Sequence, residues 1–531
     1  MLKEHNCETC KIKRLIMRSI ILLSALAGML FLSCSKTNQP PNIIVLLTDD
    51  QRLNSLSCYD EDIPIQTPNI DRLANEGIRF TNGFVTTPIC AVSRASIISG
   101  RYATNSTVHD FNQPIPEEIF EESYPACLKK SGYFVGALGK YGVGVTPQVK
   151  KTFDVFEAQS GQGPRFREYK GKTMHDTEWL TVKTNEFLDA VPKNKPFCVQ
   201  VNYKEPHGST VPAHEDDGKL DHIFFEKEEM DTPEEYEKIP DILKESLVRV
   251  DYFVDGDGGN LNAYKRSYYE MILSVERSVG KIVKSLEERG LADNTVIIFL
   301  SDHGLHLGEK ELLGKWTPYD ESLRIPFIVY DPRTRSGKGK VLDEMVLNID
   351  VAPTILELAG VEVPEGMDGR SMVSLLNGKE KSWRKEFFYE HYCSVPTVGS
   401  YLPRNEGIRT EKDKYVHWID FEGSEEYFDL ENDPKESNSL VGNAQYEARI
   451  RTLREKFIQW RTENPSSYKH VLNGLPRFAT ENIDWEKFKE VAPHHYGRIA
   501  AAVKELGVTW EQAENDWSIR YQVSKKARYW Y

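Results

Sequence analysis

Residues 87–102 read TPICAVSRASIISGRY, and the rest of the chain is organised around this stretch. A Thr-Pro turn signal opens it, and the residues that follow have helical spacing, which places Cys90, Arg94, Ile97 and Ile98 on one face. The pattern predicts a helix that starts near Cys90. The positive end of a helix dipole favours a reactive thiolate at that position. A small buried cysteine in a core helix is the alternative, since free cysteines are among the most buried residues.

The same stretch resembles the signature of the type I sulfatases, in the alkaline phosphatase superfamily. That signature is Cys or Ser, any residue, Pro or Ala, any residue, Arg, and then a small-residue helix ending in Thr/Ser-Gly-Arg, and residues 90–101 follow this order. The resemblance implies that a maturation enzyme oxidises Cys90 to formylglycine and that Arg94 fixes this nucleophile. Val92 departs from the signature, because maturation enzymes usually read Pro or Ala there, and this bears on the efficiency of conversion.

Composition limits the classes of function. The 531 residues, 40% of them hydrophobic, suffice for two or three domains and a large core. The net charge of −14 argues against a nucleic-acid partner, and for an anionic substrate it requires the positive charge to be local to the pocket. Eight scattered cysteines are too few for a disulfide framework in a chain of this length.

Residues 1–34 have the pattern of a secretory leader. Basic residues precede an apolar run from Ile20 to Leu32, which has the length of a signal-peptide core and is too short to span a membrane comfortably. The run ends in Phe-Leu-Ser-Cys, which resembles a bacterial lipobox with Cys34 as the lipidated first residue. An ordinary signal peptide is the alternative. We therefore expect a protein of the periplasm or cell envelope that is anchored to a membrane by lipid.

Two buried-strand patterns are followed by groups that could bind a cation. Residues 42–47 and 295–300 are continuous apolar runs, as expected for strands covered on both faces of a parallel sheet. Open α/β sheets bind ligands at the carboxyl ends of their strands. Carboxylates suit Ca²⁺ or Mg²⁺, whereas the nitrogen of His303 suits zinc-like metals better, so His303 is either a ligand or a neighbour. The resemblance implies Ca²⁺. The predicted metal site comprises Asp49, Asp50, Cys90, Asp302 and His303.

Two lysines and a histidine complete the expected site, each close to a strand-like segment. By resemblance, Lys140, Lys315 and His207 hold the sulfate oxygens while a hydroxyl of the hydrated formylglycine attacks sulfur. His207 or Lys315 then protonates the departing alcohol, and the remaining hydroxyl expels sulfate. Surface lysines and a structural histidine are the alternatives. Gly142 is a second departure, since the family often has a histidine there. The predicted site then has one fewer group for proton transfer or for orienting the aldehyde.

The order of segments predicts an α/β fold. A large N-terminal domain is expected to contain a mostly parallel mixed sheet sandwiched by helices, as in alkaline phosphatase, and a small C-terminal subdomain an antiparallel sheet with one helix. Residues 208–262 are polar and acidic, and we expect them to run over the surface. The predicted segments are the leader 1–34, the catalytic domain 35–375, the subdomain 376–465 and an extension 466–531.

Three functions fit these features. The first is a sulfuric ester hydrolase that removes O-sulfate from a sulfated carbohydrate, such as algal polysaccharide of the ulvan type or glycosaminoglycan fragments. Arg404 and Arg409 are candidates for contact with a uronate carboxylate, with solvated or structural roles as the alternatives. The second is a phosphodiester or phosphonate hydrolase of the same superfamily. The third is a non-catalytic glycan-binding lipoprotein, in which Val92 blocks maturation and Gly142 weakens catalysis. The expected partners are a sulfated oligo- or polysaccharide, the maturation enzyme and a membrane.

Overall fold

The structure is a computed structural model that describes residues 39–515 apart from several internal segments. The expected leader, with Cys34, lies outside the described residues. The described residues from Pro41 onward form one compact unit. Among the described helices, none is long and apolar enough to cross a membrane. The internal segments left undescribed are 209–210, 227–231, 245, 247, 250–260, 335–337, 394–401, 420–422, 466–488 and 490–492.

An eight-stranded sheet forms the centre of the unit, in the order β13-β2-β12-β9-β1-β8-β4-β5. The strands from β9 to β5 run parallel, while β12 is antiparallel to both of its neighbours. Every residue of β1, β8 and β9 is buried, which explains their unbroken apolar runs. The strands are β1 (Asn42–Thr48), β2 (Ile78–Phe80), β4 (Phe134–Lys140), β5 (Val155–Gln159), β8 (Phe197–Asn202), β9 (Thr295–Ser301), β12 (Phe327–Tyr330) and β13 (Lys340–Leu342).

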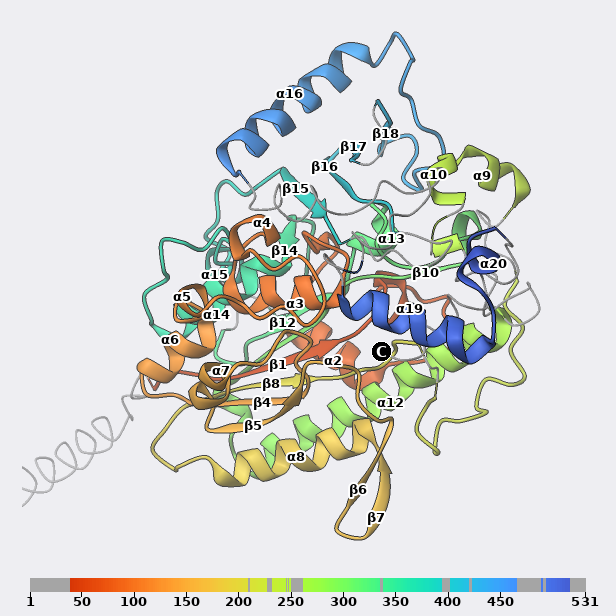
Figure 1. The fold of residues 1–531 in the computed structure, drawn as a ribbon. Coiled ribbons are helices and arrows are strands. Elements are labelled where there is room, and N and C mark those ends of the chain that lie inside the picture. Colours follow the sequence, from red (N-terminus) through yellow and green to blue (C-terminus); the bar gives the residue numbers. More distant parts are fainter. Residues whose placement is uncertain are drawn as a thin grey trace, which may run out of the picture. The chain divides into compact units, whose positions relative to one another are not determined.

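Helices cover both faces of this sheet, as predicted (Figure 1). Alternate residues of β1 enter two separate apolar cores: Val45 packs in the core of α3, α6 and α14, and Leu46 packs in the core of α2, α8 and α12. The first core continues into the small C-terminal sheet. The helices are α2 (Pro68–Glu76), α3 (Cys90–Ser99), α6 (Tyr124–Lys130), α8 (Asp176–Ala190), α12 (Leu261–Glu288) and α14 (Val351–Ala359).

The C-terminal sheet is antiparallel with one helix, as predicted, in the order β15-β16-β17-β18. Helix α16 packs on it through an aromatic stack, with the ring centroids of Phe388 and Trp460 4.6 Å apart. The domain boundaries at residues 34, 375 and 465 stay predictions. The elements are β15 (Glu386–His391), β16 (Asn405–Thr410), β17 (Asp413–Trp418), β18 (Glu425–Asp429) and α16 (Glu447–Glu463).

The insertion 208–262 is not confined to the surface, so that expectation is wrong for part of the described residues. Leu243 and Val248 are wholly buried and belong to the same apolar core as α3. The Arg249 guanidinium pairs with the Glu311 carboxylate at 2.7 Å. The polar composition of the segment masked the few apolar residues that anchor it. Its described helices are α9 (Pro233–Lys238) and α10 (Asp241–Lys244).

The remaining elements are short or lie in the C-terminal extension, where Ala502 and Val503 of α19 are buried. They are β3 (Gly83–Phe84) with β14 (Val346–Leu347), β6 (Phe166–Tyr169) with β7 (Lys172–His175), β10 (His306–Leu307) with β11 (Leu313–Gly314), α4 (Ala103–Ser106), α5 (Glu117–Phe120), α7 (Pro147–Thr152), α13 (Asp320–Leu323), α15 (Val373–Leu376), α19 (Pro493–Leu506), α20 (Trp510–Asn515), and the 3₁₀ turns η1 (Leu53–Ser55), η2 (Ala292–Asn294), η3 (Glu309–Glu311) and η4 (Asn348–Asp350).

A buried network of charges joins the two sheets. Asp320 of the large domain pairs with Lys414 at 2.6 Å and with Arg409 at 3.1 Å, both from the C-terminal sheet. The Arg409 guanidinium also lies over the Phe84 ring, 4.8 Å from its centroid. These contacts give Arg409 a structural role, while contact of Arg404 with a uronate carboxylate stays a prediction.

Glu426, in the same region, makes the stability of the fold depend on pH. Its carboxylate is buried and accepts hydrogen bonds from Trp418 Nε1 at 3.0 Å and the Tyr319 hydroxyl at 3.2 Å. Burial raises the pKa of Glu426 from its ordinary 4.5 to about 7. Between these two values the folded state binds more protons than the unfolded state, so the unfolding free energy falls as pH rises.

We predict that Glu426→Gln removes this component. From pH 5 to pH 8 the wild type should lose roughly 3 kcal/mol of unfolding free energy that the variant keeps. The Tm of the variant should therefore rise by several degrees relative to that of the wild type over this range. Thermal unfolding of both proteins at the two pH values measures it. A difference in Tm that is the same at both values would contradict the assignment.

Candidate active site

The predicted metal ligands come together at the carboxyl edge of the large sheet. β1 and β9 are parallel neighbours with Thr48 opposite Ser301, so the residues that follow each strand meet. One ligand atom from each of Asp49, Asp50, Asp302 and His303 lies within 4.8 Å of the others, and all four residues are buried. Strand pairing therefore explains why segments about 250 residues apart, as in the Asp50–Asp302 contact, form one cluster.

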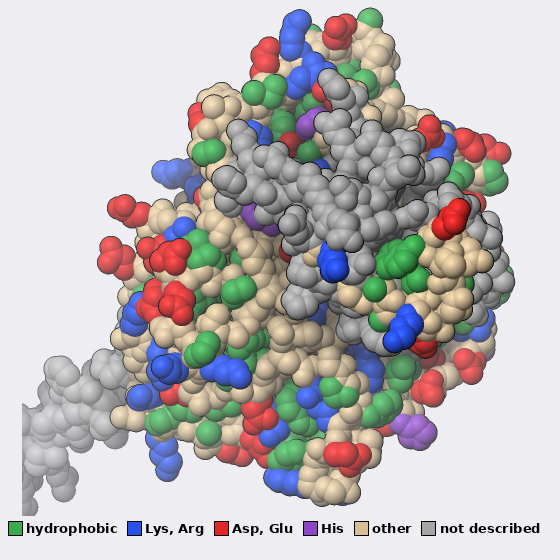
Figure 2. All heavy atoms as spheres, in the orientation of Figure 1, with side chains coloured by type: hydrophobic (Ala, Val, Ile, Leu, Met, Phe, Trp, Pro, Cys, Tyr) green, Lys and Arg blue, Asp and Glu red, His purple; other side chains and the backbone are tan. Residues whose placement is uncertain are grey.

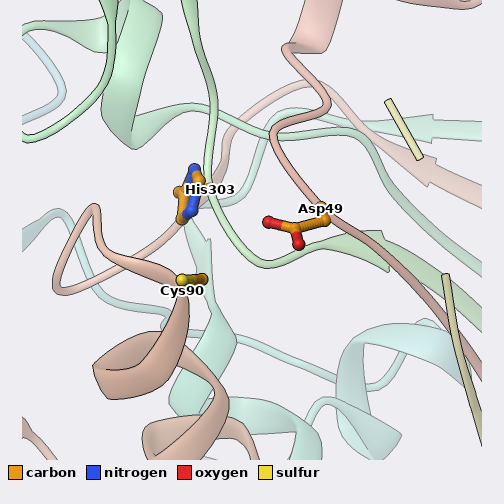
Figure 3. A group of neighbouring side chains, drawn as sticks. All are labelled: Asp49, Cys90 and His303. Atoms are coloured by element: carbon orange, nitrogen blue, oxygen red, sulfur yellow. The ribbon is translucent and has the colours of Figure 1, made fainter. Parts of the chain in front are cut away.

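The Cys90 thiol faces the same cluster from the start of α3. Its sulfur groups with ligand atoms of Asp49 and His303, again within 4.8 Å, and Figure 3 shows the three side chains around a common space. The helix starts at Cys90 as predicted. Burial raises the pKa of Cys90 despite the opposing charges of Lys140 and Lys315, so burial works against the thiolate that the helix end favours. Formylglycine chemistry does not need a resting thiolate, since the thiol is only the precursor.

Two atoms of the cluster lack a hydrogen-bond partner in the part of the chain that the structure describes: Asp49 Oδ1 and His303 Nε2. His303 Nε2 lies 3.4 Å from a carboxylate oxygen of both Asp50 and Asp302. Burial lowers the pKa of His303, which favours the neutral ring. His303 Nδ1 donates to the Gly304 carbonyl at 3.0 Å, so Nε2 carries the free lone pair. An unpaired carboxylate oxygen and an unpaired ring nitrogen, together with two further carboxylates, are a donor set that fits a divalent cation.

Positive charge is gathered inside the site. The Lys140 ammonium contacts the Asp49 carboxylate, and Lys315 Nζ lies 2.5 Å from Asp50 Oδ1. Burial opposes the ionisation of Asp49, but Lys140 and His207, followed by Arg94, hold the pKa of Asp49 well below its ordinary value. On the face shown in Figure 2, by contrast, acidic and basic side chains are interspersed. The cationic side chains that an anionic substrate requires are thus gathered in this site of a chain of net charge −14, where each is paired with a carboxylate.

His207 completes the predicted set, with Nε2 3.8 Å from Asp50 Oδ2. Its backbone is held by Arg165, whose guanidinium donates to the carbonyls of His207 at 2.7 Å and Gly208 at 2.6 Å. From the same loop, Gln162 Nε2 donates to Asp49 Oδ2 at 3.5 Å. The sequence missed Gln162 and Arg165, because a short polar loop carries no motif for its contacts.

Arg94 packs closely against Gly142. Its Nε donates to Asp302 Oδ2 at 2.8 Å, and its Nη1 donates to the Lys140 carbonyl at 2.5 Å. The stem of the arginine passes so close to Gly142 that a Cβ there would lie 2.4 Å from Arg94 Cδ, and the φ of Gly142 is +79°. Arg94 therefore occupies the space in which a side chain at position 142 would begin.

We predict that Gly142→Ala lowers the unfolding free energy by about 2–4 kcal/mol, since a left-handed backbone and overpacking both oppose the methyl group. Gly132→Ala is the matched control, because Gly132 has a φ of +91° but no atom within 4 Å of the added Cβ. Its loss should be only about 1–2 kcal/mol. Denaturant unfolding of both variants measures the two losses, and equal losses would rule out the clash with Arg94.

Comparison with known proteins places the chain in a family. A family model described as Sulfatase matches residues 41–361, which is more than half of the chain. A second model, N-sulphoglucosamine sulphohydrolase, C-terminal, matches residues 308–463. The two models together span the large sheet, the predicted site and the C-terminal sheet.

Individual relatives agree with the family models. The chain is 30% identical over 535 residues to an N-acetylglucosamine-6-O-sulfatase of Bacteroides thetaiotaomicron, with 87% of this chain and 95% of that protein covered. It is 27% identical over 493 residues to an arylsulfatase of Clostridium perfringens, covering 83% and 99%. A solved structure of a protein with its substrate D-glucosamine-2-N,6-O-disulfate matches with a TM-score of 0.69 at 28% identity, covering 81% and 99%. Members of the sulfatase family hydrolyse sulfuric esters. The chain belongs to this family, which is part of the alkaline phosphatase superfamily.

Proposed function

We propose that this sulfatase removes O-sulfate from a carbohydrate with formylglycine, made from Cys90, as its nucleophile and with Ca²⁺, or alternatively Mg²⁺, as its cation. The observation that carries the proposal is that Cys90 shares one buried space with Asp49 and His303, next to the carboxylates of Asp50 and Asp302. When bound, the cation would polarise the sulfate oxygens and favour ionisation of the nucleophile.

The side chains around residue 90 have distinct tasks in this proposal. The ammonium groups of Lys140 and Lys315 bind the sulfate oxygens and stabilise negative charge that shifts in the transition state. His207 or Lys315 gives a proton to the sugar oxygen when its bond to sulfur breaks. Arg94 is fixed by Asp302, and it holds the start of α3 and its nucleophile in place. Burial of the cluster strengthens each of these electrostatic interactions.

The names of the relatives support a sulfated sugar, and they suggest which sugar to test first. One relative is an N-acetylglucosamine-6-O-sulfatase, and one solved neighbour binds D-glucosamine-2-N,6-O-disulfate. A 6-O-sulfated glucosamine is therefore the first candidate, with sulfated algal polysaccharide next. The leader pattern supports the further proposal that Cys34 is lipidated and that the enzyme works in the cell envelope.

We predict that the enzyme, produced with its maturation enzyme, releases sulfate from N-acetylglucosamine-6-sulfate and that a chelator of divalent cations abolishes the release. Asp49→Asn should lower kcat/KM at least 100-fold, because a ligand and a charge are lost together, while Asp343→Asn, an exposed control, should leave it unchanged. Ion chromatography measures the sulfate.

A thermal readout separates the metal site from activity. Ca²⁺ should raise the Tm of wild type and of Asp343→Asn, but not that of Asp49→Asn, because only a protein that binds the ion gains from mass action. Release of phosphate but not sulfate from model aryl esters would contradict the proposed reaction. An unchanged Tm in Ca²⁺, together with activity that resists chelation, would contradict the metal site.

A further inference from the structure

A histidine with no assigned task lies at the end of β15. His391 is 0% exposed, and in the described part of the chain neither of its ring nitrogens has a hydrogen-bond partner. A neutral imidazole has one donor and one acceptor, and both cost free energy when they are buried without a partner. Such a group calls for a ligand or a water molecule.

Strand β15, which ends in His391, is hydrogen-bonded to the segments before and after α3, the helix that starts at Cys90. The backbone N–H of Glu390 donates to the Thr86 carbonyl at 2.9 Å, ahead of the helix that starts at Cys90. The Glu390 carboxylate accepts from the backbone N–H of Thr104 at 2.7 Å, beyond the end of that helix. The end of β15 is thereby held against the segment that positions the nucleophile.

The neighbouring strand β16 contacts the loop that carries Lys315. His391 pairs with Asn405 across the sheet, and the side-chain amide of Asn405 donates to the Trp316 carbonyl at 3.0 Å. Trp316 directly follows Lys315, which we place on the sulfate. The strand ends that carry His391 and Asn405 therefore connect the segment around residue 90 with the loop that carries Lys315.

The groups around His391 belong to the same region. Burial lowers the pKa of His391 to about 3, and the positive charge of Arg404 acts in the same direction. Two residues further on, the Cys393 sulfur lies 3.2 Å from Asp110 Oδ1. Burial raises the pKa of Cys393, to which Asp110 and then Cys90 add. The ring of His391 is thus neutral near the centre, and it suits an uncharged polar group better than a second anion.

We propose that His391 binds the sugar part of the substrate and helps to select it, by hydrogen bonds between its ring and a hydroxyl or amide group. Both groups can donate and accept, as a neutral imidazole does. The sulfate is held separately by Lys140, Lys315 and His207, so His391 acts on the leaving group. This inference rests on the proposed function and adds a subsite to it.

Inhibition of the matured full-length enzyme distinguishes the two subsites. The inhibition constants of inorganic sulfate and of the desulfated sugar are measured against sulfated-sugar hydrolysis in wild type, His391→Ala and His391→Phe. We expect both variants to raise the constant of the sugar about tenfold, the worth of one or two neutral hydrogen bonds, and to leave that of sulfate within twofold. His417→Ala, on β17 with 34% of its side chain exposed, should change neither constant.

His391→Phe guards against a cavity-induced folding defect, since it keeps a buried aromatic ring, slightly larger than imidazole, while it removes both ring nitrogens. An unchanged constant for the sugar, or equal changes for sugar and sulfate, would overturn the subsite. Hydrolysis of aryl sulfates but of no sulfated sugar would overturn the carbohydrate substrate, and the subsite with it. No sulfate release from any ester would instead refute the proposed function.

Discussion

Three carboxylates buried side by side are the constraint on which the rest of this structure depends. Asp49, Asp50 and Asp302 are withdrawn from water, which costs several kilocalories per mole for each charge unless partners compensate it. The fold supplies Arg94, Lys140 and Lys315 as cations and leaves oxygen and nitrogen atoms unpaired beside them. A divalent cation and a sulfate group would complete this balance of charge, and the same buried arrangement would stabilise the transition state.

The constraint extends to residues that touch neither metal nor substrate. Arg94 donates to the Lys140 carbonyl at the end of β4 and to Asp302, and in this position its stem opposes a side chain at position 142. The departure from the family pattern at Gly142 is therefore linked to how the arginine is packed. Arg165 acts from outside the cluster in a similar way, by fixing the backbone that presents His207.

Much of this architecture could be predicted from the sequence because its elements have strong local patterns. Strands buried on both faces read as unbroken apolar runs, and parallel pairing then brings the residues after residues 42–47 and 295–300 to one edge. The helix that starts at Cys90 and the gathering of Asp49, Asp50, Asp302 and His303 followed from this rule together with the family signature, whereas their binding of metal and sulfate stays a prediction.

The features that sequence reasoning missed depend on contacts between distant segments. The expectation of a reactive thiolate at Cys90 considered only the helix end. In the folded protein, burial of the side chain raises the pKa of Cys90. Leu243 was hidden within an acidic segment, and Arg165 within a loop without a motif. In the sequence, His391 carries no signal beyond that of a strand residue. Its unpaired nitrogens become informative because contacts of Glu390 and Asn405 place the end of its strand close to the active site.

The central claim is that residue 90 becomes the nucleophile, and the mass of the peptide that contains it tests this most directly. The protein is produced in a host that matures other sulfatases, and the peptide is measured after proteolysis. The account predicts a mass about 18 Da below that of the cysteine peptide, since an aldehyde replaces the CH₂SH group before the nucleophile can act. Unmodified Cys90 in that host would contradict this claim, and it would indicate that the departure from the usual signature at Val92 prevents maturation.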